Sequence, residues 1–125
     1  MKYFRIHVSY TGKTGKLVGI FGACWHLKQA GKLLAEEIQL LEDIDAWYDE
    51  YLPNPAFYDD GNPQKAITWF KDTPDARQLA ERLSQLTQLL DKYEVPYKES
   101  RTSDPGAIIY EDEYQVAVTD WNPHS

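Results

Sequence analysis

Two short turns in the chain combine aromatic rings with carboxylates, and these residues are the best suited to bind a ligand. They are Tyr58, Asp59, Asp60 and Asn62 in the first turn and Tyr110, Glu111 and Asp112 in the second. Aromatic faces and carboxylates together attract cations, including the side chains of lysine and arginine. If the fold brings the two turns together, they form an acidic pocket with aromatic walls. Carboxylates in turns also bond to nearby backbone N–H groups, so a purely structural role is the competing interpretation.

The first turn belongs to the most informative stretch of the chain, Pro53–Lys71. Its residues 53–65 form a loop with three prolines, which is long for a compact domain and therefore indicates a functional segment. A short strand rich in β-branched and aromatic residues follows over Ala66–Lys71. Further candidates for the same ligand- or partner-binding site are Trp69, Lys71, His7 and Arg101.

Other motifs carry a weaker signal. Gly12-Lys13-Thr14 resembles the end of a phosphate-binding loop, but His7 stands where that motif needs its first glycine. Cys24 and His26 could ligate a metal, but on a helix their side chains diverge by about 200°. Cys24 beside a histidine also lacks an orienting third group for nucleophilic catalysis. We therefore expect no metal, cofactor or nucleotide, and the sequence leaves open whether the protein is an enzyme.

The net charge of −7 is unevenly distributed along the chain. Residues 1–35 carry six Lys/Arg and no Asp or Glu, whereas residues 36–125 carry seven Lys/Arg and twenty Asp/Glu. The acidic excess disfavours nucleic acid as a ligand, because phosphate groups need a basic surface. It favours either attraction between the two parts within the fold or docking of a basic protein partner.

The compartment follows from the cysteine content and the apolar runs. Cys24 is the only cysteine, so an intramolecular disulfide cannot form. The N-terminal residues alternate between polar and apolar, unlike a signal peptide, and no apolar run approaches the ~20 residues of a membrane span. We expect a cytoplasmic protein that makes no membrane contact.

Hydrophobic periodicity predicts the elements that position these residues. Strand Tyr3–Tyr10 places Phe4 and Val8 toward the core and His7 on the more polar face. Helices are predicted over Gly19–Ala30, from Leu33 or Leu34 to Leu52, and from Pro74 to about Tyr93. The second of these carries seven acidic residues, of which the later ones lie on a solvated face or serve a partner. The remaining strands are Ala66–Lys71, Tyr97–Thr102, Ala107–Tyr110 and Tyr114–Thr119.

The element order is therefore β-α-α-β-α-β-β-β over one domain, residues 1–125. It predicts an α+β fold of two layers, with a four- to five-stranded mixed sheet and helices packed on one face. The last three strands are expected to form an antiparallel meander, with the polar strand Tyr97–Thr102 at an edge.

Three functions fit this pattern. The first is a non-enzymatic interaction module that binds a basic protein through an acidic, aromatic-rich surface. The second is a small enzyme or small-molecule-binding protein whose site surrounds the 53–71 loop and strand. The third is a homo-oligomer that pairs through an exposed part of its sheet.

Overall fold

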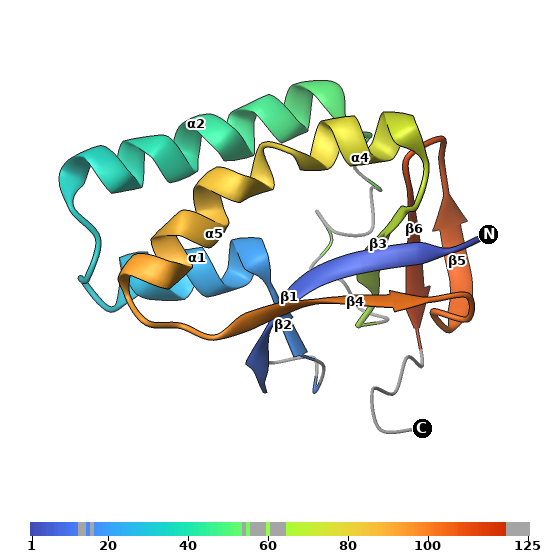
Figure 1. Ribbon diagram of the computed structural model, residues 1–125, viewed down its shortest axis with the longest axis horizontal. Coiled ribbons are helices and arrows are strands. Elements are labelled where there is room, and N and C mark those ends of the chain that lie inside the picture. Colours follow the sequence, from blue (N-terminus) through green and yellow to red (C-terminus); the bar gives the residue numbers. More distant parts are fainter. Residues whose placement is uncertain (13–14, 16, 54, 56–59, 61–64, 120–125) are drawn as a thin grey trace.

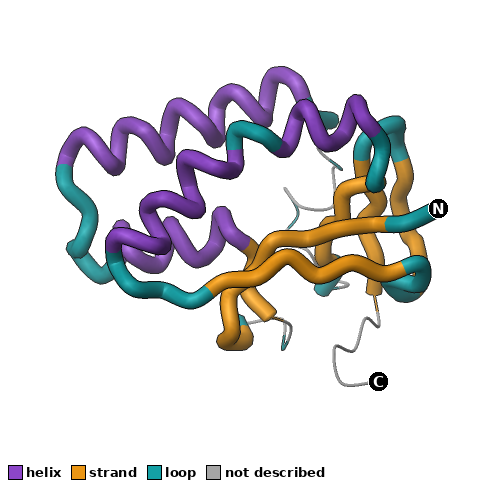
Figure 2. The backbone as a smooth tube through the Cα atoms, in the orientation of Figure 1, coloured by secondary structure: helices purple, strands orange, loops and turns teal. Residues whose placement is uncertain are grey.

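The computed structural model describes residues 1–12, 15, 17–53, 55, 60 and 65–119. The helices are α1 (Ile20–Gln29), α2 (Ala35–Tyr51), α4 (Pro74–Ala80) and α5 (Leu83–Lys92). The strands are β1 (Tyr3–Thr11), β2 (Leu17–Gly19), β3 (Ile67–Lys71), β4 (Tyr97–Thr102), β5 (Ala107–Glu111) and β6 (Gln115–Thr119). In Figures 1 and 2, α2, α4 and α5 lie above β1 and β4. Helices and one sheet in separate parts of the chain confirm the predicted α+β class.

The six strands form one sheet in the order β2-β1-β3-β6-β5, with β4 also paired to β1. Every pairing is antiparallel, so the prediction of a mixed sheet of four or five strands was wrong in these details. The helical crossover from β3 to β4 does join two strands that run in the same direction. They are not neighbours, however, because β1 is inserted between them and pairs antiparallel with both.

The predicted meander of the last three strands was also wrong. Only β5 and β6 form the expected hairpin, whereas β4 pairs with β1 from Tyr3↔Thr102 to Val8↔Tyr97. Sequence proximity favours hairpins, but β1 is a longer strand than β5, with 9 residues against 5, and β4 pairs with β1 instead. In the described chain β4 pairs with β1 alone, so its predicted position at an edge is confirmed.

Strand β1 is forked along its other edge. Tyr3 and Phe4 pair with β3 near its start, whereas His7 and Thr11 pair with β2 toward its end. Because β4 occupies the opposite edge from Tyr3 to Val8, β2 and β3 lie on the same side of β1, which changes partner between Phe4 and His7. The short strand β2 was not predicted, since three residues are too few to show a period.

The main core lies between the helices and one face of the sheet. It joins β1 through Val8 to α1, α2 and α5, with buried residues that include Cys24, Leu41, Ile44 and Leu86. A second cluster lies in the sheet itself: Tyr3, Ile67, Trp69, Val116 and Val118. Both faces of β1 are therefore largely buried over its first six residues, and the more polar face, with Arg5 and His7, is buried as well.

Two helices follow the predicted signals closely. Helix α1 ends before Gly31, whose φ of 72° lies in the left-handed region that glycine adopts without strain. Helix α2 buries Leu41, Ile44 and Tyr48 on its core side. Among its acidic residues, Glu37 in the first turn is buried against α5.

The single helix predicted from Pro74 to about Tyr93 is two helices. Thr73 caps the first one, since its side chain accepts a hydrogen bond from the Ala76 N–H, as its sequence signal predicted. At residues 81–82 the N–H groups of Glu81 and Ser84 bond three residues back rather than four, which tightens the backbone and ends α4. No proline or glycine marks this break, so the periodicity runs through it.

Candidate functional site

A cleft of about 660 Å³ opens at the fork between β2 and β3. Its walls come from β1, β2, β3, the start of α1 and the end of α2. Apolar side chains predominate, and they include Ile6, Val18, Phe21, Leu52, Ile67 and Phe70. A volume of this size accommodates a small organic ligand, for which a mostly apolar lining with a few polar groups is typical.

Glycines let the walls of this cleft approach each other. A Cβ atom at Gly22 would lie 2.9 Å from Cγ1 of Val18, so only glycine allows α1 to begin so close to β2. A Cβ atom at Gly19 would lie 3.3 Å from Nη2 of Arg5. The same Nη2 donates a hydrogen bond to the Leu17 carbonyl at 2.7 Å, which joins β1 to β2 near the point where β1 changes partner.

Polar groups are few and mostly fixed. Gln115 donates from Nε2 to the carbonyl of Pro53 at 2.5 Å, which anchors the end of α2 and the start of the following loop to β6. The Tyr48 hydroxyl donates to the Leu79 carbonyl at 2.6 Å. His26 lies at an exposed wall, with Nδ1 2.9 Å from the Tyr10 hydroxyl. The cleft therefore combines a mostly apolar lining with a few polar side chains, several of which are already hydrogen-bonded.

The stretch singled out from the sequence contributes directly to this cleft. Pro53, Pro55, Ala66, Thr68 and Phe70 line it, together with Ile67. Of the residues proposed in the turn of the same stretch, the structure describes only one. Tyr58, Asp59 and Asn62 lie outside the described residues, and Asp60 is exposed. Whether the two acid–aromatic turns meet therefore stays a prediction.

The second turn, Tyr110–Tyr114, is held by internal bonds. The Asp112 carboxylate accepts hydrogen bonds from the Tyr110 hydroxyl at 2.7 Å and from the Tyr114 N–H at 2.8 Å. Burial, followed by the Asp112 carboxylate, raises the pKa of Tyr110 to about 12. Glu111 forms an ion pair with Lys71 at 2.5 Å, so the fold does bring these two candidates together.

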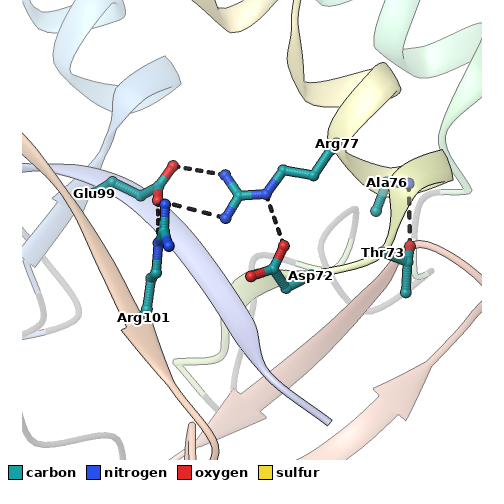
Figure 3. Close-up of polar contacts among 6 residues, drawn as sticks. All are labelled: Asp72, Thr73, Ala76, Arg77, Glu99 and Arg101. Carbon is teal, nitrogen blue, oxygen red and sulfur yellow. Dashed lines mark hydrogen bonds and ion pairs between the residues drawn. The ribbon is translucent and has the colours of Figure 1, made fainter.

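The remaining candidates have structural partners. Trp69 is fully buried inside the sheet cluster. Arg101 donates to Glu99 at 2.6 Å, and Glu99 in turn accepts from Arg77 at 2.8 Å (Figure 3). Arg77 also pairs with Asp72 at 2.8 Å and lies over the Phe4 ring, so this network fastens α4 to β1 and β4.

His7 bonds to its neighbours through both ring nitrogens. Nδ1 lies 3.0 Å from the Val8 carbonyl, which can only accept, so Nδ1 carries the proton. Nε2 then accepts from the Ser100 hydroxyl at 2.6 Å. Burial lowers the pKa of His7, and the positive charges of Arg5 and Lys98 act in the same direction. These contacts cross-link β1 to β4.

A second, smaller cleft of about 370 Å³ lies between α2, α4, the α4–α5 break and the β5–β6 turn. It is lined by Trp47, Asp75, Gln78, Leu79, Glu81, Arg82 and Tyr114. From the sequence, Tyr114 begins a predicted strand and Trp47 lies within a predicted helix, and neither was predicted as a site residue. No local signal could join them, because residues 47, 75 and 114 meet only through packing.

Cys24 is buried, and burial raises the pKa of its thiol to about 12, so it is not an activated nucleophile. The described residues contain no group of three or more His, Cys, Asp or Glu side chains placed to hold a metal ion. No helix in the described part of the chain has the length and apolar character needed to cross a membrane. In comparisons with known proteins, no family model, curated protein or solved structure matches this chain.

Proposed function

We propose that the protein binds a small, mainly apolar molecule in the cleft at the fork of the sheet. The observation that carries this proposal is the cleft itself, about 660 Å³ in volume and lined mostly by apolar side chains. Clefts of ~300–1,000 Å³ with this lining are the usual sites of small organic ligands. Its walls include the stretch that the sequence marks as functional.

The fold supplies a reason for this position. A sheet whose strands pair continuously leaves no space between neighbours, because adjacent strands lie about 4.8 Å apart. Here β1 changes partner along one edge, from β3 at Tyr3 and Phe4 to β2 at His7 and Thr11. The cleft lies at this change of partner, since residues of β1, β2 and β3 all line it.

The test uses N-phenyl-1-naphthylamine, a neutral apolar dye whose fluorescence rises when it leaves water. We expect saturable binding to one site per chain. The variant Thr68→Phe fills the cleft from β3 and is expected to weaken binding about tenfold, because the added ring takes the volume that the dye needs.

The matched control is Thr87→Phe, which adds the same ring on α5 away from the cleft and leaves dye affinity unchanged. Circular dichroism confirms that both variants are folded. Absence of saturable binding, or equal weakening by both substitutions, contradicts the proposal.

A second candidate function is docking of a basic protein partner, as the charge pattern of the sequence favours. The supporting observation is the outer surface of α2, where Glu36, Glu42, Asp43, Asp49 and Glu50 are exposed and no basic residue occurs in the helix. A peptide of alternating glycine and arginine, acetyl-(Gly-Arg)4-amide, serves as the probe. Its affinity should fall steeply from 50 to 500 mM NaCl, because exposed charges are screened by salt. Binding that is indifferent to salt contradicts this candidate.

A further inference from the structure

The smaller cleft has aromatic walls and an acidic rim. Trp47 of α2 and Tyr114 of the β5–β6 turn face it, and Leu79 contributes an apolar surface. Asp75 and Glu81, at the two ends of α4, bring exposed carboxylates to its margin. Neither carboxylate forms an ion pair within the described part of the chain.

The acidic surface of α2 continues into this cleft. Asp43 precedes Trp47 by four residues and Glu50 follows it by three, and residues with these spacings share one side of a helix. Both carboxylates are exposed. A cation that approaches Trp47 therefore passes carboxylates from α2 as well as from α4.

The pKa of Tyr114 reflects the negative charges around this side chain. The Glu113 carboxylate raises the pKa of Tyr114, and burial and the Asp75 carboxylate raise it further. Negative charges therefore surround this phenol from its own turn and from α4. The acid–aromatic turn that the sequence singled out does meet a second acid–aromatic group, contributed by α2 and α4.

The chain places one of its own guanidinium groups in the same cleft. The Arg82 guanidinium lies over the Trp47 ring, 4.4 Å from its centroid. This contact shows that the aromatic wall accepts a guanidinium cation over the face of its ring. Arg82 offsets only part of the negative charge, since Asp75, Glu81 and Glu113 all lie around the cleft.

We propose that this cleft receives an arginine side chain of a basic protein partner. The guanidinium would lie beside Tyr114 and Arg82, with its N–H groups directed to the carboxylates of Asp75 and Glu81. Arginine fits better than lysine, because its planar group stacks on aromatic rings and on other guanidinium groups, and donates two parallel hydrogen bonds to one carboxylate. The inference rests on the second candidate function and gives it a location.

The test compares two double variants that each remove two negative charges. Asp75→Asn with Glu81→Gln alters the cleft, whereas Asp104→Asn with Glu94→Gln alters two exposed residues that neither line the cleft nor belong to α2. Titration with acetyl-(Gly-Arg)4-amide should give about tenfold weaker binding to the cleft variant and a loss below about threefold in the control. NMR spectra of the unmodified protein should show a shift of the Trp47 indole N–H on addition of the peptide.

Each outcome distinguishes the location from the function. Equal weakening by both double variants, with the Trp47 signal unmoved, overturns the cleft as the site while leaving a basic partner in place. Absence of any binding to the unmodified protein overturns both. A peptide with lysine in place of arginine that binds as tightly overturns the preference for a guanidinium.

Discussion

Glu37 has a structural role although it belongs to an acidic helix. Its carboxylate accepts a hydrogen bond from the Leu34 N–H at 2.8 Å, which satisfies the start of α2. It also pairs with Lys92 at 2.7 Å and accepts a short hydrogen bond from the Tyr93 hydroxyl. One side chain thus joins the first turn of α2 to the last turn of α5.

The pH dependence of this contact has a definite sign. Hydrogen bonds from Lys92, Tyr93 and the Leu34 backbone lower the pKa of Glu37 to about 2, from 4.5. The folded protein therefore binds this proton less tightly than the unfolded chain does. The stabilisation is fully present above pH 4.5 and is lost as the pH falls toward 2.

We predict that Glu37→Gln lowers the melting temperature by several degrees at pH 6. The difference from the unmodified protein should shrink between pH 4.5 and 2, because both proteins then carry an uncharged group at position 37. Thermal unfolding followed by circular dichroism across this range measures the difference. A difference that stays constant with pH shows that the charge of Glu37 does not stabilise the fold.

At the scale of elements, the break between α4 and α5 depends on α2. The Leu79 carbonyl at the end of α4 accepts a hydrogen bond from the Tyr48 hydroxyl, and Arg82 in the break lies over Trp47. Two adjacent residues of α2 therefore hold the bend between the two helices. This arrangement shapes the smaller cleft, because Leu79, Glu81 and Arg82 line it.

Tyr48→Phe is expected to destabilise the protein by about 1–2 kcal/mol, because it removes the donor to a carbonyl in a largely buried position. Tyr51→Phe on the same helix provides the control, since Tyr51 is 51% exposed and should tolerate the change. Urea unfolding measures both variants. Equal stability of the two variants means that the bend does not depend on this hydroxyl.

Strands β2, β4 and β5 are the edges of the sheet in the described chain, and β4 and β5 differ in character. Strand β4 carries Lys98, Glu99 and Arg101, which is typical of a protected edge. Strand β5 exposes Ile108 and Ile109, at 45% and 37%, although a register shift between Ile108 and Tyr110 interrupts its ladder. The sequence hypothesis of self-association through an exposed face of the sheet stays a prediction.

At the scale of the whole molecule, one core holds the two layers together. The main cluster includes residues from β1, α1, α2 and α5. Unfolding of any one of these three helices would therefore expose apolar side chains of the other two. Strand β1 pairs with three strands and links the N-terminus to residues nearly a hundred positions away. We therefore expect the described elements to unfold together.

Leu86→Ala tests this expectation. Leu86 is fully buried in the main cluster, so its truncation should cost about 2–5 kcal/mol. The control Leu34→Ala, at a side chain that is 50% exposed, should cost less than about 0.5 kcal/mol. Tryptophan fluorescence and circular dichroism should give coincident urea transitions for each protein. Separate transitions contradict a single cooperative core.

Local signals in the sequence were sufficient for most elements. The helix start at Thr73, the helix end at Gly31 and the hairpin of β5 and β6 each follow from nearby residues. The break at residues 81–82 did not follow, because it has no proline or glycine and depends on Tyr48 and Trp47 from another helix. Strand β2 was missed because it is short and lies beside a glycine-rich turn.

The candidate sites likewise depend partly on local sequence and partly on tertiary packing. The sequence by itself determined the α+β class and the net negative charge, since these depend on composition and on residues close in the chain. It also singled out the 53–71 stretch, part of which lines the larger cleft. Only the tertiary structure decided that β1 forks between β2 and β3 and that Trp47 meets Asp75 and Tyr114. Pairing register and packing between distant segments set both clefts, and neither leaves a periodic trace in the sequence.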